Sequence, residues 1–346
     1  MSPTQLPKYA ADQQIPAAQL FLSGLIDYAG MFPPTALPLH DALLNFARYR
    51  TEQDAWMLSR FIVPSTALQE LDAYADLFNE RPPFRFSVTL KGGTGYDSFL
   101  DNYRSTLERI RSFEAKHGNK VRIEMIEARL PVPGKSPDNP EKMLPFFELV
   151  ERSTLDTLGH SVDLFFEIPW QVTFKDDFQS THDDLFDHAA TAIQWYNKQP
   201  EDERIHLGFK LRCGGVYPQE VPASEVVASA LSHVIRCEIP FKATAGLHHP
   251  VRQYYPEFGG TMHGFLNVFG AALLGRKNKL NVTQLTGIIN EEDPAAFTLN
   301  DNTFAWRDLS VPLDDVEKAR AAQFISYGSC SFDEPREDLV DLKLLR

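Results

Sequence analysis

Two stretches of the chain decide its fold, IHLGFKLRCGG (205–215) and IPFKATAGLHHP (239–250). In both, apolar residues alternate with polar or small ones, which is the period-two pattern of a β-strand whose two faces differ. The alternation places Lys210 and Lys242 on the polar face of their strands. In each stretch glycine closes the strand pattern, at Gly214 and at Gly246, and a helical pattern follows, so we expect parallel strands joined by helical crossovers.

The same strand-then-helix alternation runs through the preceding chain. Strands are predicted at 56–63, 84–90, 121–130, 162–168, 205–212 and 239–245. Helices are predicted at 38–50, 66–79, 96–116, 141–158, 182–197 and 223–236. Beyond residue 262 the pattern weakens. Residues 264–269 fit a seventh strand or the start of a helix reaching 274, and 282–290 fit a helix. An eighth strand is expected within 297–309, then a helix at 314–326 and an irregular tail.

Eight such units would close a barrel. We therefore predict an α/β protein of the TIM-like (β/α)8 class with an N-terminal helical extension. Residues 1–52 form that extension packing on the barrel, and 53–346 form the catalytic barrel with a C-terminal tail. The alternative is an open doubly wound sheet, but the glycine-rich nucleotide-binding motifs usual in such sheets are missing from the sequence.

Composition narrows the classes of partner. The chain has 346 residues, 43% of them hydrophobic, and a formal net charge of −13. An acidic chain without a basic run is a poor match for nucleic acid or an anionic membrane. With no leader-like segment at the start and three scattered cysteines, a cytoplasmic location is expected. The oligomeric state is left open, with a homo-oligomer among the states allowed.

Sites in parallel α/β proteins lie at the carboxyl ends of the strands. Period-two counting places a set of polar residues at these ends or on the inward faces: Arg60, Lys91, Glu127, Arg129, Glu167, Lys210, Arg212, Lys242 and Thr244. This much charge is costly to bury unless it is paired or used. Because cations predominate there in an acidic protein, we expect a small anionic substrate.

The segment FKATAG (241–246) resembles the lysine strands of class I aldolases of the deoxyribose-phosphate aldolase type. That resemblance implies a Schiff-base lysine with a second lysine on a neighbouring strand. Over most of its length the chain also resembles an uncharacterised bacterial protein family, through DYAGMFPP (27–34), KLRCGG (210–215), KATAGLHHP (242–250) and GSCSFDEP (328–335). The second resemblance implies no activity.

These features predict a lyase or aldolase-type enzyme acting on a small anionic carbonyl compound without a cofactor. Lys242 is expected to form the Schiff base, because a buried amine beside another cation becomes nucleophilic. Lys210 would tune that amine or relay a proton, with Glu167 and His248 assisting proton transfer. The substrate would be held by Arg212, Lys91, Arg60, Arg129 and Thr244.

Two other functions fit the same residues. One is a metal-dependent lyase, isomerase or hydrolase in which His248, His249, His263 and Glu127 bind a divalent metal ion. The other is a barrel that binds a small molecule without turning it over. Cys213 could be a nucleophile beside Lys210 and Arg212, but its place before two glycines favours a packed residue.

Overall fold

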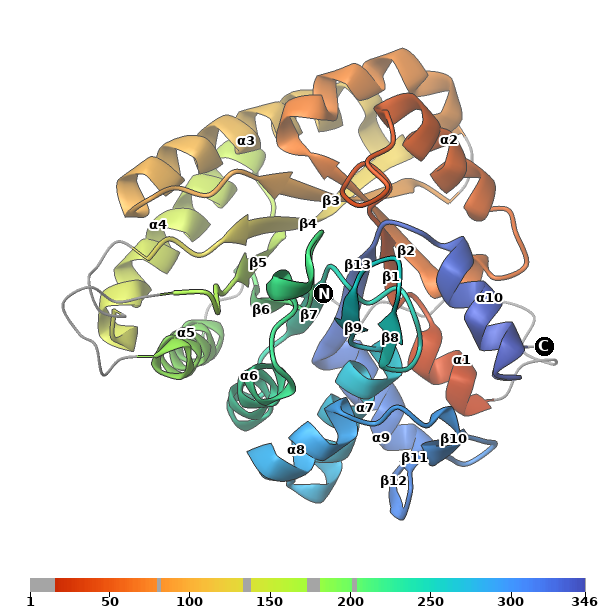
Figure 1. Ribbon diagram of the computed structural model, residues 1–346. Helices are drawn as coiled ribbons and strands as arrows, with labels where there is room; N and C mark the ends of the chain where they lie inside the picture. The colour runs from red at the N-terminus through yellow and green to blue at the C-terminus, as the bar shows by residue number, and fades with distance from the viewer. Residues whose placement is uncertain (1–15, 80–81, 133–137, 173–180, 201–203, 346) are drawn as a thin grey trace. The chain divides into compact units, whose positions relative to one another are not determined.

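The computed structural model describes residues 16–345 except 80–81, 133–137, 173–180 and 201–203 (Figure 1). By their internal contacts the described residues form two compact units. Arg60–Lys210 form the middle unit, and the residues up to Ser59 together with those from Leu211 form the terminal unit.

Eight parallel strands form a closed barrel with flanking helices, in the order β1-β13-β7-β6-β5-β4-β3-β2. They are β1 (Ile26–Tyr28), β2 (Leu58–Pro64), β3 (Phe84–Leu90), β4 (Val121–Arg129), β5 (Asp163–Glu167), β6 (Leu207–Arg212), β7 (Phe241–Thr244) and β13 (Phe324–Ser329). The predicted TIM-like (β/α)8 class is thereby confirmed.

The middle unit follows the expected alternation of strand and helix. Its helices are the 3-10 segment Ser65–Asn79, α3 (Tyr96–His117), a short 3-10 turn Gly118–Lys120, α4 (Pro140–Leu158) and α5 (His182–Asn197). Outward aromatic side chains of the strands pack on these helices. The ring of Phe86 on β3 lies 5.6 Å from that of Phe113 on α3, and Phe166 on β5 lies 5.3 Å from Phe147 on α4. The aromatic side chains on the outward faces of these strands therefore form contacts with the helices.

Two barrel strands lie where the sequence did not predict them. β1 falls within residues 1–52, which were expected to be an extension outside the barrel, and β13 overlaps the end of the helix expected at 314–326. β1 pairs in parallel with β13, and β13 pairs in parallel with β7. A three-residue strand is too short to show alternation, and β13 (FISYGS) carries small residues that blur it.

The seventh and eighth strands proposed from the sequence are corrected by the structure. Residues 264–269 begin α7 (Phe265–Asn278), which confirms the helical alternative for that stretch. Residues 297–309 enter a separate antiparallel sheet of β10 (Phe297–Leu299), β11 (Thr303–Trp306) and β12 (Leu309–Pro312). Short strands joined by tight turns can pair only with their neighbours, so this stretch does not supply a barrel strand.

Arg320 marks the point where the last helix gives way to β13. Its buried guanidinium donates hydrogen bonds to the carbonyl oxygens of Phe21 and Ser23 at 2.9 Å each and to that of Ile325 at 2.7 Å. These oxygens lie at the end of α1 (Pro16–Leu22) and in the first residues of β13. One side chain thus satisfies backbone acceptors at two chain ends that would otherwise be buried without partners.

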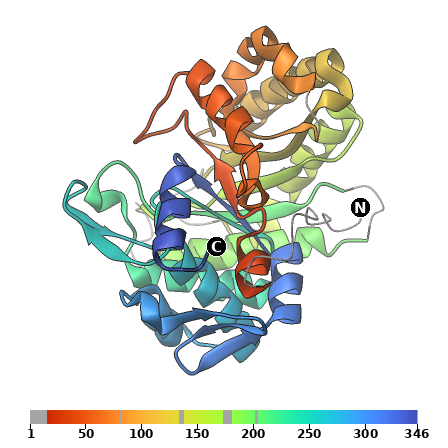
Figure 2. The same ribbon diagram turned by 90° about the vertical axis from the view of Figure 1, so that its right-hand side faces the viewer.

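The remaining elements belong to the terminal unit. Its helices also include α2 (Leu39–Tyr49), α6 (Ser224–Cys237), α8 (Val282–Ile289), α9 (Leu313–Ala322), α10 (Asp333–Asp341) and the 3-10 turns Ala55–Met57, Pro218–Glu220 and Pro294–Ala296. β8 (Gln253–Tyr255) and β9 (Gly260–Met262) pair antiparallel as a hairpin, teal in Figure 2. Among the described residues, no helix combines the length and apolar character that crossing a membrane requires.

Gly214, just past β6, and Gly246, just past β7, let two backbones approach closely. Gly246 has φ +72°, and a Cβ added to it would lie 2.8 Å from the Cα of Gly214. Next to this contact, the amide of Cys213 donates to the carbonyl oxygen of Thr244 at 2.8 Å. Any side chain at Gly246 would therefore meet both backbone strain and a backbone clash.

We predict that Gly246→Ala lowers the free energy of unfolding by about 3 kcal/mol, as the sum of left-handed strain and overpacking. Gly159→Ala is the matched control, because Gly159 has φ +72° but a Cβ added there would have no neighbour within 4 Å. It should cost about 1 kcal/mol. Urea denaturation of both variants measures this, and equal losses would contradict the clash.

Candidate functional site

In the middle unit, Lys210 lies between two carboxylates at the carboxyl ends of three successive strands. Its Nζ is 2.9 Å from Oε2 of Glu127 on β4 and 3.1 Å from Oε2 of Glu167 on β5. Ser87 on β3 donates a 2.5 Å hydrogen bond to Oε1 of Glu127. The side chains of Lys210 and Glu127 are 9% and 1% exposed. Four polar groups from four strands thus form one buried cluster, which we call the Lys210 cluster.

A bulge in β4 explains why Glu127 points inward. The β3–β4 register passes from Phe86 opposite Ile123 to Ser87 opposite Met125, so Glu124 is an extra residue. An extra residue reverses which side chains face inward from that point on. The apolar and polar residues of β4 therefore exchange faces halfway along the strand.

The extra residue Glu124 is itself held by arginines. Its carboxylate accepts two hydrogen bonds from Arg85, at 2.7 and 2.8 Å, and Oε2 lies 3.0 Å from Nε of Arg60. Burial raises the pKa of Glu124, but the charges of Arg60 and Arg85 outweigh it and the pKa is lowered. Arg60, which the sequence offered as a substrate ligand, is buried in this ion pair instead.

Lys210 keeps its proton at neutral pH. Burial lowers the pKa of its amine, but the charges of Glu127 and Glu167 and their hydrogen bonds outweigh burial and raise the pKa. A protonated amine donates hydrogen bonds and protons but is not a nucleophile. The Lys210 cluster can therefore act as an acid paired with carboxylate bases.

In the terminal unit, Lys242 on β7 is paired with Asp27 on β1. The two side chains are 0% exposed, and Nζ is in direct contact with Oδ2 of Asp27. Ser326 on β13 donates a 2.6 Å hydrogen bond to the same oxygen. Lys242 and Ser326 are partners in the β7–β13 register, and Asp27 pairs with Gly328 two residues further on, so all three side chains share one face. We call this group the Lys242 cluster.

A third cluster lies just past the strand ends of the terminal unit. Nδ1 of His248 is 3.1 Å from Oε2 of Glu334 and 3.7 Å from Sγ of Cys330. Burial lowers the pKa of His248, but the hydrogen bonds and charges of Cys330 and Glu334 outweigh burial and raise it to about 10. His248 is thus a cation at neutral pH, suited to donating a proton rather than accepting one.

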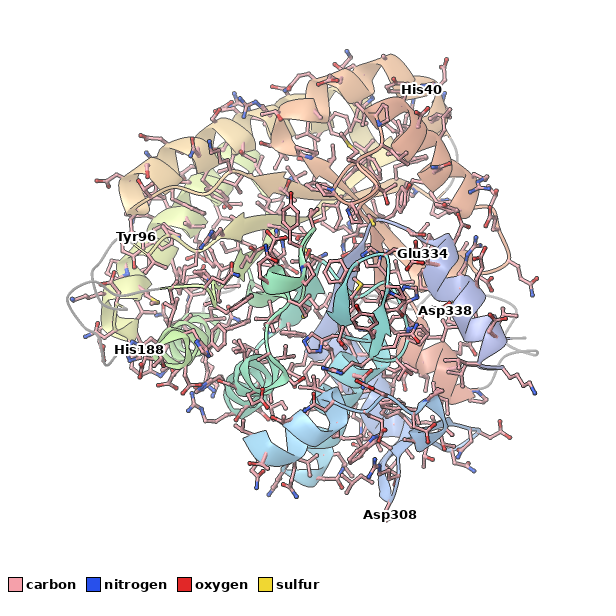
Figure 3. The ribbon with its side chains drawn as sticks, viewed as in Figure 1. His40, Tyr96, His188, Asp308, Glu334 and Asp338 are labelled. Atoms are coloured by element: carbon pink, nitrogen blue, oxygen red, sulfur yellow. The ribbon has the colours of Figure 1, made fainter. Side chains whose placement is uncertain are left out.

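The other two candidate histidines, His249 and His263, contact other residues than His248 does. Nδ1 of His249 is 2.5 Å from Asp338, and its ring stacks on Tyr255 at 4.2 Å. Glu334 and Asp338 are about one turn apart on α10 (Figure 3). Nε2 of His263 meets the carbonyl oxygen of Pro222 at 2.8 Å.

The three histidines therefore have separate partners. No group of three or more His, Cys, Asp or Glu side chains within the described ranges is arranged to hold a metal ion. Of the proposed set, His248, His249 and His263 are not brought together as one ligand group within the terminal unit, and Glu127 belongs to the middle unit.

The remaining predicted substrate ligands lie at the ends of their strands. Lys91, Arg129 and Arg212 are exposed, and Thr244 is half-buried with its carbonyl oxygen bound to the amide of Cys213. Exposed cations at strand ends can meet an anionic group from solvent, so their assignment stays a prediction.

Sequence reasoning missed Ser87 of the Lys210 cluster and four residues of the other two clusters: Asp27, Ser326, Cys330 and Glu334. A signal for Asp27 was present, since it is a lone charge within the apolar stretch at 17–32. Ser326, Cys330 and Glu334 lie in or just after β13, which was not recognised as a strand. Comparison with protein-family models and with curated proteins found no match.

We predict that Lys210→Met lowers the free energy of unfolding by about 3 kcal/mol at pH 7, because it leaves buried carboxylates without their cation. An amine whose pKa is raised by folding contributes stability that is fully present below its unfolded pKa of ~10.4 and lost as pH rises through the folded value. The difference between wild type and variant should therefore shrink above pH ~10.4.

Urea denaturation from neutral to alkaline pH measures this difference. Lys120→Met, at an exposed lysine of the same unit, is the control and should change stability by less than about 0.5 kcal/mol. A Lys210→Met loss no larger than the control's would contradict the ion-pair account.

Proposed function

We propose that the chain is a lyase that acts on a small carbonyl compound through a Schiff base on Lys242. The observation that carries this proposal is the Lys242 cluster, a buried amine in contact with a carboxylate that also accepts a hydrogen bond from Ser326. Its place on barrel strands fits an enzyme, since barrel enzymes take reacting groups from strands. The resemblance of residues 241–246 to the lysine strands of class I aldolases supports the same assignment.

The chemistry needs a proton acceptor beside the amine. Asp27 takes a proton from the Lys242 ammonium, and the neutral amine attacks the carbonyl carbon of the substrate. Asp27 then returns the proton to the departing hydroxyl, and water leaves as the imine forms. The protonated imine draws electrons from the bond between its α- and β-carbons, and that bond breaks as Asp27, again a carboxylate, takes the proton of the β-hydroxyl. An aldehyde leaves and an enamine remains on Lys242, and Asp27 returns the proton to the enamine carbon to give the product imine. Water hydrolyses the product imine and restores the amine.

The two lysines that the sequence treated as partners differ in their neighbours. The raised pKa of Lys210 keeps its amine protonated, which excludes it as the attacking group at neutral pH. Its positive charge is also balanced by Glu127 and Glu167. A role in acidifying Lys242 therefore has little support, and proton donation suits Lys210 better.

Burial of Lys242 sets one condition on this reaction. Because the side chain is 0% exposed, its amine must leave Asp27 to meet a substrate. The lysine stem has four rotatable carbons, so the amine can move while β7 stays in place.

A second candidate function is favoured by the Lys210 cluster. In this cluster a glutamate carboxylate can abstract a proton and the protonated lysine can donate one without a covalent step, as a lyase or isomerase of a small anionic compound requires. Exposed Lys91 and Arg129, at the ends of β3 and β4, would hold the anionic group.

Reductive trapping tests the covalent proposal. Purified protein is incubated with acetaldehyde or pyruvate and cyanoborohydride, and the modified peptide is identified by mass spectrometry. We predict an adduct on Lys242, absent from Lys242→Arg and unchanged in amount in Lys210→Arg. Turnover of a responsive substrate should fall at least about 1000-fold in Lys242→Arg, the order that loss of a covalent residue costs.

Three outcomes would decide against it. An adduct confined to exposed lysines, or one that persists in Lys242→Arg, would show that Lys242 is structural. Turnover that survives Lys242→Arg but is lost in Lys210→Met would favour the proton-transfer candidate. Ligand binding without adduct or turnover would favour a non-catalytic barrel.

A further inference from the structure

A cysteine, a histidine and a glutamate from separate segments meet beside the end of β13. Cys330 directly follows the last residue of β13, His248 lies four residues beyond the end of β7, and Glu334 is in the first turn of α10. The single Nδ1–H of His248 faces both Sγ of Cys330, at 3.7 Å, and the Glu334 carboxylate, at 3.1 Å. Neither Cys330 nor Glu334 has a part in the lyase chemistry proposed above.

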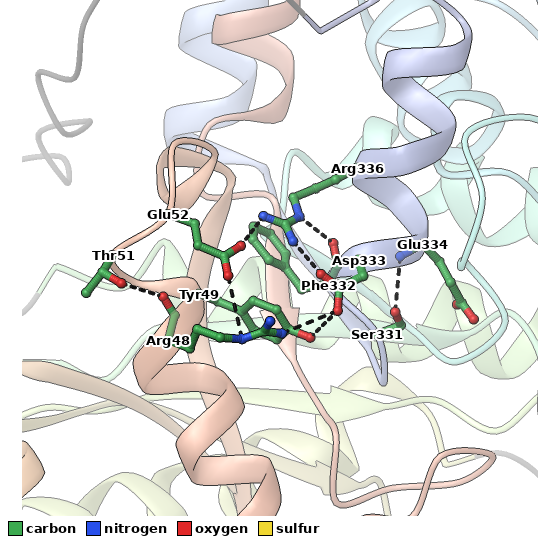
Figure 4. A network of polar contacts seen from close by, with 9 residues as sticks. All are labelled: Arg48, Tyr49, Thr51, Glu52, Ser331, Phe332, Asp333, Glu334 and Arg336. Atoms are coloured by element: carbon green, nitrogen blue, oxygen red, sulfur yellow. Dashed lines mark hydrogen bonds and ion pairs between the residues drawn. The ribbon is translucent and has the colours of Figure 1, made fainter.

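The first turn of α10 is fixed by a separate polar network (Figure 4). Arg336 is paired with Glu52 and Asp333, and it donates a 3.1 Å hydrogen bond to the carbonyl oxygen of Phe332. Tyr49 donates a 2.5 Å hydrogen bond to Asp333. The backbone amide of Glu334 donates to Oγ of Ser331 at 3.2 Å. With the start of α10 held by Tyr49 of α2 and by Ser331, the carboxylate of Glu334 is positioned to orient His248.

Charge favours the ionised forms of the pair. Burial raises the pKa of the Cys330 thiol, but the hydrogen bond and charge of His248 and hydrogen bonds from Thr35 outweigh burial and lower it. Glu334 also acts on His248, and the charges of His249 and Asp333 act in turn on Glu334. The pKa of nearby Tyr28 is raised by burial and by the charges of Cys330 and Asp333. The arrangement is that of a thiolate beside an imidazolium whose other partner is a carboxylate.

A second cysteine of the terminal unit, Cys213, can be compared with Cys330. Cys213 also follows a barrel strand and is completely buried, and burial raises the pKa of its thiol to about 12. The charge of Arg212 only partly opposes that effect. Cys330 is 6% exposed, and its partner Glu334 has half of its side chain in solvent. His248 would stabilise a thiolate at Cys330, whereas Cys213 has only the charge of Arg212. The two cysteines also differ in their access to solvent.

We propose that Cys330 is a reactive thiolate, activated by the imidazolium of His248, that exchanges with small disulfides and reacts with soft electrophiles. In the exchange its sulfur attacks one sulfur of the small disulfide, forming a new protein–ligand S–S bond as the original S–S bond breaks. The released thiolate takes a proton from His248 or water, and the small disulfide is the oxidant. A small thiol reverses the step. The proposal stands apart from the lyase function, because it is read from modification rather than turnover.

Alkylation of the folded protein tests this proposal. Wild type is treated with iodoacetamide at several pH values between 5.5 and 9, and each cysteine peptide is quantified by mass spectrometry. At pH 6 only about 0.3% of a cysteine with an ordinary pKa of ~8.5 is thiolate. We expect Cys330 to react at least tenfold faster than Cys213 at pH 6 and to depend weakly on pH. With 2-hydroxyethyl disulfide, one mixed disulfide should form on Cys330 and disappear with dithiothreitol.

Two variants distinguish activation of Cys330 by His248 from simple access of the reagent to Cys330. His248→Gln should slow alkylation of Cys330 at pH 6 at least tenfold and restore the rate by pH 9. Glu334→Gln keeps the thiolate–imidazolium contact and should stay within about threefold of wild type. Circular dichroism checks that both variants are folded. The proposal is overturned if Cys330 in the folded protein reacts no faster than Cys213 at pH 6, or if His248→Gln reacts like wild type at that pH.

Discussion

The contact between Lys242 and Asp27 is the constraint around which the terminal unit is organised. Both side chains are removed from water, and taking a single unpaired charge out of water costs several kcal/mol. The pairing offsets that cost only if both partners stay in place. β1 contributes Asp27, β7 contributes Lys242, and β13 between them contributes the hydroxyl of Ser326. A shift of any of these strands by one residue would turn its polar group to the opposite face.

The same constraint explains how a strand of three residues can hold its place in the barrel. β1 offers few backbone hydrogen bonds, but its central residue, Asp27, is paired with Lys242 on β7, which lies on the other side of β13. Arg320 adds a second fixed point by binding the carbonyl oxygens of Phe21 and Ser23, just before β1. A reactive lysine needs this kind of setting, with a rigid frame and a movable amine. The setting is therefore compatible with covalent chemistry and also with a purely structural ion pair.

Much of the fold could be predicted from alternation alone. β3 and α5 have the predicted bounds, because their flanking glycines and caps are clear and their periodicity is unbroken. β1 and β13 could not be predicted, since one is too short for a period and the other has small residues where apolar ones would be expected. The change of phase in β4 depends on the bulge at Glu124, which local sequence does not reveal. The positions of β1 and β13 and the change of phase in β4 depend on pairing with strands distant in the sequence.

The candidate site was predictable to the same extent. Lys210 and Lys242 are buried on their strands as alternation implied, and Glu127 and Glu167 were among the expected neighbours. Their pairing was not predictable, because the carboxylate that meets Lys242 comes from an unrecognised strand 215 residues earlier. Reading the two lysines as one cationic pair overlooked the carboxylates that each of them meets, Asp27 for Lys242 and Glu127 with Glu167 for Lys210.

A double-mutant cycle at Asp27 and Lys242 tests the central claim most directly. The free energies of unfolding of wild type, Asp27→Leu, Lys242→Met and the double variant are measured by urea denaturation. Each single variant should lose about 3 kcal/mol or more, because one charge is left buried alone, and the double variant should regain most of that loss. Losses that simply add in the double variant would contradict the account, because they would show that the two side chains do not depend on each other.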